Sequence, residues 1–437
     1  MRILRYLLFT LLAALFVLVW KSLPILSGYG AKVLCSGIFV AERNPADVVR
    51  DDLGDFPFSL VSYTVDQEDS SVTGSILGMA RKKALFRRGL GSVLVNGISG
   101  QELKSQRVRL SAPPSMNQDT IDWPQGNRIT DTFRDGVDAQ KVQSAMDEVF
   151  REGKSHKIDT RAVVILYHGQ IIGEQYAAGF SVNTPQLGWS MTKSIINALL
   201  GILVKQGKLD IRAPAPVEAW KNDERRTITQ ANLMNMRSGL RWWEFYTGPS
   251  PCTDMLFKEK NMGEFAMESS LSNQPGTQYK YSSGTVNILS AIVRKTIGDA
   301  DYYRFPYEQL FYKIGMLHTV LETDAGGTFV GSSYCYATPR DWARFGLLYM
   351  NDGVWNGERI LPEGWVAFTR TGEGYGALWW LKKYPHVPAD CFSCEGFGGQ
   401  HVWVIPSRKL VIVRLALEHG DRMDADRFLG EVLAAVR

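Results

Sequence analysis

The chain opens with a continuous apolar segment, Tyr6 to Trp20, which carries no charge. Basic residues stand on both sides of it: Arg2, Arg5 and Lys21. Fifteen residues is short for a membrane-spanning helix and within the range of the apolar part of a signal peptide. The span is completed if residues 22–26 continue the helix while Lys21 extends its charged end to the interface.

The segment 1–28 is therefore predicted to be either an uncleaved membrane anchor, through residues 6–26, or a cleaved signal. A buried helix of a soluble protein is the remaining alternative. In the first two cases the basic N-terminus stays inside and the rest of the chain is exported. We expect a protein of the cell envelope, on the periplasmic face of the inner membrane or released beyond it.

Residues 29–136 show short apolar stretches separated by glycine and proline, which is typical of short strands and turns. Val93-Leu94-Val95, for example, lies between Gly91 and Gly97. No catalytic constellation is visible here. We expect an N-terminal extension that packs on the domain that follows.

From residue 137 onward the apolar positions alternate between helical and strand spacing. Residues 192–204 are apolar on every side, which predicts a helix buried at the centre. The pattern also predicts helices at 137–151, 284–297, 339–351 and 424–436, strands at 161–167 and 171–176, and a hairpin at 400–416. Terminal strands and a terminal helix around a helical middle favour an α/β fold (an α+β sandwich) over 137–437. It consists of an antiparallel sheet flanked by helices, with an inserted, mostly helical subdomain.

Composition and the absence of certain motifs limit the possible classes of function. The chain is 45% apolar and 22% charged with a formal net charge of +4, as in an ordinary globular protein. Zinc-ligand spacings, a Walker loop and a GxGxxG after a strand are all absent from the sequence. We therefore expect no nucleic-acid partner, no metal and no cofactor. The five cysteines are few for a disulfide scaffold, and Cys391 and Cys394 are expected to be buried thiols or one local bridge.

The main chemical candidate is Ser190 in the segment 188–193 (GWSMTK), directly before the buried helix. At a helix start its hydroxyl is accessible, and its N–H lies at the positive helix end, where an oxyanion is stabilised. Lys193 follows three residues later and therefore lies on the same face. A lysine among apolar neighbours loses pKa and can accept a proton. Ser190 is predicted to be a nucleophile paired with Lys193, and either Lys193 or Tyr281 is expected to take its proton.

Two further segments could complete the site. Tyr281 precedes the apolar helix 284–297, and a neighbouring ammonium would lower its pKa and let it relay a proton. Gly398 and Gly399 stand at the head of a strand, where glycine lets a substrate approach. The N–H of Gln400 is then predicted to be the second oxyanion donor.

Other residues leave alternatives open. His401 could be the base of a rival histidine-dependent triad, a wall of the substrate cleft or a plain sheet residue; the sequence holds six histidines and no GxSxG elbow. Glu244 could contact substrate or make a structural hydrogen bond. Trp189, Trp379 and Trp380 could line an acyl pocket or pack in the core.

Together the three segments resemble the serine β-lactamase and penicillin-recognising family. Ser190-Met191-Thr192-Lys193 resembles its S-x-x-K motif, Tyr281-Ser282-Ser283 its Y-x-N motif, and Phe397-Gly398-Gly399 the slot of K-T-G or H-x-G. The likeness covers about 137–437 and is strongest to the class C branch, especially 6-aminohexanoate-dimer hydrolases. It implies a small ester, amide or peptide as substrate and an acyl-enzyme on Ser190.

Two positions depart from the lactamase pattern. Ser283 stands where lactamases of this branch carry an asparagine that contacts the substrate amide. Phe397 replaces the residue that helps to hold a β-lactam carboxylate. Both favour hydrolysis of an ester or linear amide. The alternatives are a D-amino-acid peptidase or weak β-lactamase and, in another class, a non-catalytic envelope-binding protein.

Overall fold

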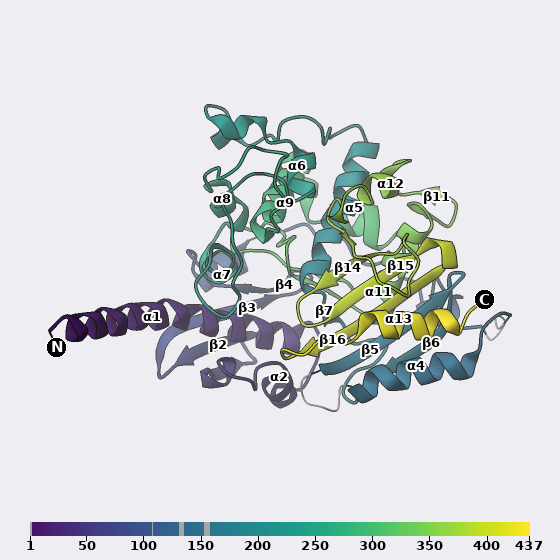
Figure 1. The fold of residues 1–437 in the computed structure, drawn as a ribbon, viewed down its shortest axis with the longest axis horizontal. Coiled ribbons are helices and arrows are strands. Elements are labelled where there is room, and N and C mark those ends of the chain that lie inside the picture. The colour runs from purple at the N-terminus through teal and green to yellow at the C-terminus, as the bar shows by residue number, and fades with distance from the viewer. Residues whose placement is uncertain (1, 107, 131–134, 153–157) are drawn as a thin grey trace.

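The computed structural model describes residues 2–106, 108–130, 135–152 and 158–437, and within them a seven-stranded antiparallel sheet forms the centre (Figure 1). Its order is β12-β13-β14-β15-β16-β5-β6. The first hairpin of the domain, β5 (Ile158–Tyr167) and β6 (Gln170–Tyr176), therefore lies beside the last strand, β16 (Leu410–Glu418). The other strands are β12 (Gly374–Tyr375), β13 (Trp380–Leu381), β14 (Phe392–Gly396) and β15 (Gln400–Ile405).

Helices cover both faces of this sheet. On one face α4 (Ala139–Glu152) and α13 (Ala425–Ala434) pack against side chains such as Val163 and Ile412. On the other face lie α5 (Thr192–Lys205) and α11 (Pro339–Met350). The middle strands are covered on both sides, which explains why β16 is apolar almost throughout its length. The predicted α+β sandwich is confirmed.

The segment between α5 and α11 forms the inserted helical subdomain, which lies beside the sheet in Figure 1. Its helices are α6 (Gln230–Met234), α7 (Pro251–Lys258), α8 (Met262–Met267), α9 (Ser283–Ile297) and α10 (Asp299–Tyr302). A small sheet of β7 (Gln186–Leu187), β9 (Cys335–Ala337) and β8 (Val320–Leu321) lies next to it. The remaining elements are β10 (Val354–Trp355), β11 (Glu358–Arg359) and α12 (Trp365–Thr369).

The N-terminal region differs from its prediction in containing helical segments, of which the first is the longest. Residues 29–39, expected to form strands and turns, are the last turns of a single helix, α1 (Arg2–Phe39), which passes through Pro24 without interruption. Glycines disfavour an isolated helix, but here they let neighbours approach closely. A Cβ on Gly30 would lie 2.1 Å from the Tyr63 hydroxyl, and one on Gly28 would lie 3.3 Å from Phe257. Tertiary packing therefore overrides local propensity.

The second half of α1 is held in the body by a buried ion pair. Lys32 and Glu322 pair directly, and both side chains are almost completely buried. Glu322 also accepts hydrogen bonds from the Ser36 hydroxyl at 2.8 Å and the Ser92 N–H at 2.7 Å. A paired and fully hydrogen-bonded buried carboxylate fixes the relative positions of the elements that contribute to it.

The rest of residues 29–136 also packs on the catalytic region. Its described residues contain α2 (Pro45–Asp52), α3 (Gly100–Ser105) and a four-stranded sheet, β1 (Ser62–Asp66), β2 (Ser71–Ile76), β3 (Met79–Arg87) and β4 (Gly91–Leu94), which lies against α1. Arg344 of α11 donates to the carbonyl groups of Pro124 and Gly126. The domain boundaries at residues 28 and 136 stay predictions.

Candidate active site

Ser190 lies in a single 3-10 turn, Trp189–Met191, directly before α5. Trp189 has a positive φ of 46°, an unfavourable backbone conformation for a bulky residue. The turn is fixed by hydrogen bonds from the Gly188 N–H to the Cys335 carbonyl and from the Thr192 hydroxyl to the Trp189 carbonyl. Such strain persists only where the surroundings impose it, and it is common at functional sites. Ser190 is thereby presented, partly exposed, beside the end of β14.

Lys193 is buried, with 1% of its surface exposed, and reaches back to the serine. Its Nζ lies 2.9 Å from Ser190 Oγ, 3.2 Å from Ser283 Oγ and 2.8 Å from the Ser332 carbonyl oxygen. Burial lowers the pKa of Lys193 to about 8, although the charge of Glu244 opposes the shift. The sequence predicted both the contact and the direction of the shift. The Ser332 carbonyl was not foreseen, because it is far away in the chain.

This pKa predicts a rise of activity with pH. Below about 8 Lys193 is an ammonium and cannot take the proton of Ser190, so kcat/KM should fall about tenfold per pH unit. Above that pKa the amine is neutral and the profile should level off. The measurement is kcat/KM for a neutral ester from about pH 6 to about pH 9.5. A profile that is flat across this range would exclude Lys193 as the base.

Tyr281 lies against the lysine, with its ring centroid 4.9 Å from Lys193 Nζ. Its ring stacks on Trp380 at 5.5 Å and meets Tyr375 edge-on at 5.9 Å. Burial and then the charge of Glu244 raise the pKa of Tyr281 well above its usual value, while a hydrogen bond with Ser190 acts in the opposite direction. We expected the neighbouring ammonium to lower this pKa; burial outweighs it. Tyr281 therefore keeps its proton and can donate it.

Glu244 holds the loop beside the site. Its carboxylate accepts hydrogen bonds from the Ser283 N–H at 2.5 Å, from the Trp242 indole at 2.9 Å and from the Tyr246 hydroxyl. The hydrogen bond from the Ser283 N–H fixes the start of α9, next to Lys193. Of the two alternatives for Glu244, the structure shows the structural hydrogen bond.

The glycine-rich turn reaches the nucleophile segment at Gly396, two residues before the first of the predicted glycines, Gly398. A Cβ on Gly396 would lie 2.1 Å from the Gly188 carbonyl oxygen, and the Phe397 ring lies 5.8 Å from the ring of Trp189. Gly396 ends β14, and its position directly before Phe397-Gly398-Gly399 was the sequence signal that could have singled it out.

The glycines singled out from the sequence face elsewhere. A Cβ on Gly398 or Gly399 would point at Leu417 or Glu418 of β16. Gln400 is buried, and its amide oxygen accepts a hydrogen bond from the Ala416 N–H at 3.2 Å. The role of the Gln400 N–H as an oxyanion donor stays a prediction.

His401 lies on the wrong face for the cleft. Its ring stacks on Trp403 at 4.4 Å, and Trp403 packs with Phe428 of α13, on the face opposite to α5. Burial and then Arg414 lower the pKa of His401 well below its usual value. Successive side chains of a strand point to opposite faces of the sheet. His401 faces α13, so its neighbour Gln400 points to the face of α5. His401 is therefore a sheet residue, neither a base nor a cleft wall.

The three tryptophans lie in different surroundings, and the cysteines are unpaired. Trp379 is fully buried in the core, whereas Trp189 and Trp380 contact site residues. All five cysteines are buried free thiols. In the part of the chain that the structure describes, no group of three or more His, Cys, Asp or Glu residues is arranged to hold a metal ion.

Comparison with known proteins shows the family to which the chain is related. The family model described as Beta-lactamase matches residues 137–434. A 6-aminohexanoate-dimer hydrolase of Paenarthrobacter ureafaciens is 24% identical over 291 residues, which are 59% of this chain and 72% of that protein.

Solved structures share the fold. A Bacillus anthracis protein described as a 6-aminohexanoate-dimer hydrolase has a TM-score of 0.59 and 22% identity, covering 73% of this chain and 88% of its own. A class C β-lactamase has a TM-score of 0.55 and 15% identity, covering 70% and 99%. A family VIII carboxylesterase has a TM-score of 0.52 and 16% identity, covering 68% and 96%. The chain thus belongs to the β-lactamase family and is a serine hydrolase.

Proposed function

We propose that this protein hydrolyses an ester or a linear amide through an acyl-enzyme on Ser190. The observation that carries the proposal is the 2.9 Å contact between Ser190 Oγ and the amine of Lys193, whose pKa is lowered to about 8. A serine hydroxyl is a weak nucleophile until an adjacent base takes its proton. Lys193 is that base, and its three contacts keep it aimed at Ser190.

In the first step Ser190 Oγ bonds to the carbonyl carbon while its proton passes to Lys193. The bond to the leaving oxygen or nitrogen breaks, and that atom takes the proton of Tyr281, which Lys193 then restores. Water attacks the acyl-enzyme, returns a proton to Ser190 and releases the acid. The N–H of Ser190 holds the oxyanion together with a second N–H from the turn 397–400. Gln400 is the candidate from the sequence, and Phe397 is another because it directly follows Gly396.

An ester or linear amide is favoured over a β-lactam by the side chains around Ser190. Phe397 presents an aromatic ring at the turn where lactamases carry a cationic or hydrogen-bonding residue. Ser283 offers only a hydroxyl, which is already engaged with Lys193 at 3.2 Å. The similarity to a 6-aminohexanoate-dimer hydrolase supports the same choice.

A panel of substrates tests this choice. With the full-length protein we expect p-nitrophenyl acetate or a linear aminohexanoate dimer to be cleaved with kcat/KM at least about a hundredfold above that for nitrocefin, since missing polar contacts discriminate by such factors. Nitrocefin hydrolysis that matches or exceeds both others would favour a β-lactamase instead. Cleavage of D-peptides alone would favour a D-peptidase.

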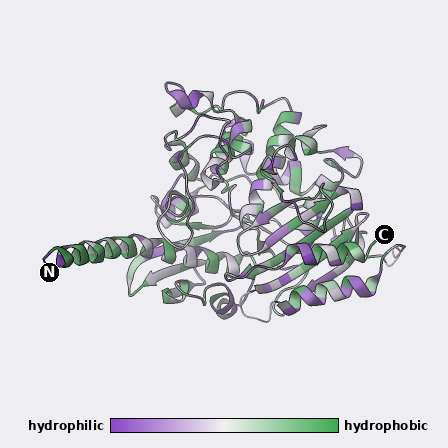
Figure 2. Cartoon of the chain, in the orientation of Figure 1, coloured by the Kyte–Doolittle hydropathy of each residue, from purple (hydrophilic) through white to green (hydrophobic). Residues whose placement is uncertain are grey.

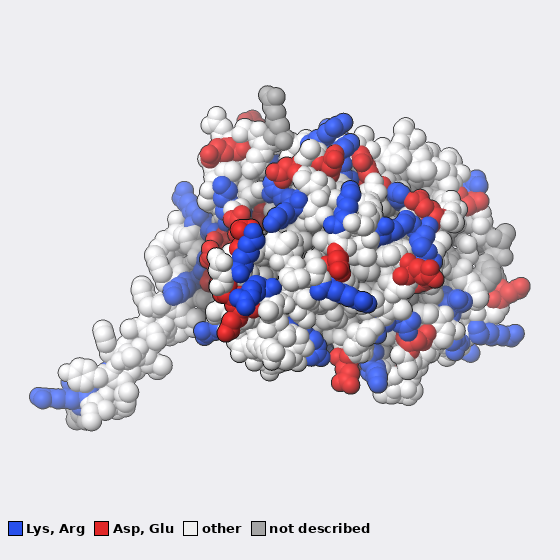
Figure 3. Space-filling view, turned by 90° about the horizontal axis from the view of Figure 1, so that it is seen from above, with Lys and Arg blue, Asp and Glu red and all other residues white. Residues whose placement is uncertain are grey.

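We also infer that α1 is an uncleaved membrane anchor. It is one apolar N-terminal helix long enough, by length and composition, to cross a membrane. Residues 2–21 are exposed and form a rod about 30 Å long, which is about the thickness of the hydrocarbon core. The rod is largely hydrophobic (Figure 2), and basic side chains lie at its free tip (Figure 3), while Lys21 lies at its other end. The Lys32–Glu322 pair makes the other half of the same helix part of the fold, which argues against removal of the segment. The basic tip would leave the catalytic body outside the cytoplasm.

A further inference from the structure

Exposed aromatic side chains gather beside the nucleophile turn. We call Tyr246 and Phe397 the aromatic rim; they are 38% and 45% exposed. The Phe397 ring lies 5.8 Å from Trp189 and 5.7 Å from Tyr246, so the rim continues directly to the residue before Ser190. Apolar surface left exposed next to reactive groups is typical of a binding site for an apolar ligand.

The candidate anchor helix reaches the same turn from another side. Tyr29 of α1 stacks on Trp189 with 5.8 Å between ring centroids and 10° between ring planes. Phe58, from the segment after α2, stacks on Tyr29 at 4.2 Å. Trp189 therefore contacts both α1 and the aromatic rim, and an unbroken set of aromatic rings connects the helix to the reaction centre.

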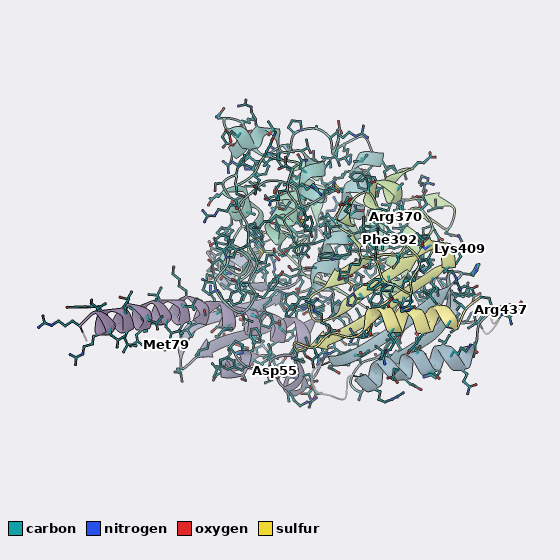
Figure 4. All side chains as sticks on the ribbon, viewed as in Figure 1. Asp55, Met79, Arg370, Phe392, Lys409 and Arg437 are labelled. Atoms are coloured by element: carbon teal, nitrogen blue, oxygen red, sulfur yellow. The ribbon has the colours of Figure 1, made fainter. Side chains whose placement is uncertain are left out.

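The helix also sets the distance between the site and the bilayer. Lys21 is the last exposed residue of the projecting rod, and Tyr29 follows eight residues later, about 12 Å along the helix axis. The turn between β2 and β3 lies beside this part of α1, because Ile76 packs with Leu26 and Leu23. That turn carries the exposed apolar side chains of Leu77 and Met79, and Met79 lies by the projecting half of α1 in Figure 4. The apolar side chains of Leu77 and Met79, at the height where α1 leaves the bilayer, would enter the membrane interface and hold the body close to it.

We propose that the enzyme takes its substrate from the membrane: an ester or amide that carries a long apolar chain. The chain lies on Trp189, Tyr29 and the aromatic rim while Ser190 attacks the carbonyl carbon. This inference rests on the proposed function and adds its substrate class. Because α1 is one continuous helix from the bilayer to Trp189, the path of an amphiphile from membrane to serine is short and lined with aromatic rings.

The test compares two p-nitrophenyl esters, the acetate and the octanoate, with the full-length protein in lipid nanodiscs. Each rate is divided by that ester's rate of hydroxide hydrolysis, so that intrinsic reactivity cancels. The octanoate has six more methylenes than the acetate, and each methylene removed from water raises kcat/KM by about fourfold. Burial of only half of them is expected to give an octanoate-to-acetate ratio of about 60 or more. Phe397→Ala should lower this ratio by about tenfold, through KM of the octanoate. Phe56→Ala, which removes an aromatic ring that is 80% exposed, is the matched control and should leave the ratio unchanged.

The two proposals fail in different ways. If the acetate is cleaved and the octanoate gains nothing, the apolar-chain site is wrong while the proposed hydrolase function stands. If the octanoate is preferred but Phe397→Ala and Phe56→Ala change the ratio equally, the aromatic rim is not the binding site and the inference is overturned. If neither ester is cleaved, the proposed function fails and this inference fails with it.

Discussion

Ser190→Ala should abolish ester hydrolysis, with a loss in kcat/KM of at least about four orders of magnitude. Without the Ser190 hydroxyl no acyl-enzyme can form at the turn, and Ser283, which also contacts Lys193, cannot substitute because it is buried while Ser190 is partly exposed. The fold should persist, because the exchange removes only the hydrogen bonds of a partly exposed side chain to Lys193 and Tyr281, each worth about 1 kcal/mol. Hydrolysis is measured with p-nitrophenyl acetate and stability by thermal unfolding.

A substantial residual rate would contradict the assignment. If Ser190→Ala keeps more than about a tenth of the wild-type kcat/KM at unchanged Tm, the reaction does not pass through Ser190. Loss of activity together with a large drop in Tm would not discriminate, so Ser190→Cys serves as a second variant. Cysteine is close to serine in size and should react with iodoacetamide at position 190 when Lys193 activates the thiol. Absence of that modification would count against the activated site.

Lys193→Met should lower kcat/KM by about three orders of magnitude. Methionine has a similar length and suits the buried, apolar surroundings of Lys193, so the volume is kept while the proton acceptor is lost. The Ser332 carbonyl loses its donor, yet a buried basic group also disappears, so we expect a change in Tm of a few degrees at most. The remaining activity should lose the dependence on pH near 8 that Lys193 confers.

Lys205→Met is the matched control, because Lys205 lies exposed at the far end of the same helix, α5, where it donates a hydrogen bond to the Arg359 carbonyl. Its activity should stay within about twofold of the wild type, as expected for a surface exchange. If Lys193→Met and Lys205→Met have equal activities, the lysine of the site is not the catalytic base.

Local sequence was sufficient to predict those helices and strands in which the spacing of apolar residues follows the pattern of burial. Residues 192–204 are apolar on every side, which placed α5 at the centre, and Lys193 inside it could be assigned a lowered pKa before its contacts were known. The hairpin of β5 and β6 and the terminal helix α13 followed from periodicity in the same way. The contact between Ser190 and Lys193 needed only the pitch of one helical turn.

The errors arose where long-range packing decides the outcome. Residues 29–39 are helical because Tyr63 and Phe257 lie where side chains on Gly30 and Gly28 would stand, and no local pattern reveals those neighbours. For His401 the sequence left a base, a cleft wall and a sheet residue open, because a shift of one position in strand phase moves a side chain to the other face of a sheet. The pKa of Tyr281 depends on burial by Trp380 and Tyr375, which are about a hundred residues away in the chain.

The most direct test of the central claim is covalent labelling with a fluorophosphonate probe, followed by intact-mass measurement and peptide mapping. A fluorophosphonate phosphonylates an activated serine and leaves ordinary serines unmodified. The account predicts one adduct per chain, located on Ser190, with none in Ser190→Ala and slow labelling in Lys193→Met. Absence of an adduct on Ser190 in the folded wild-type protein would contradict it and would favour a non-catalytic binding protein that retains the fold.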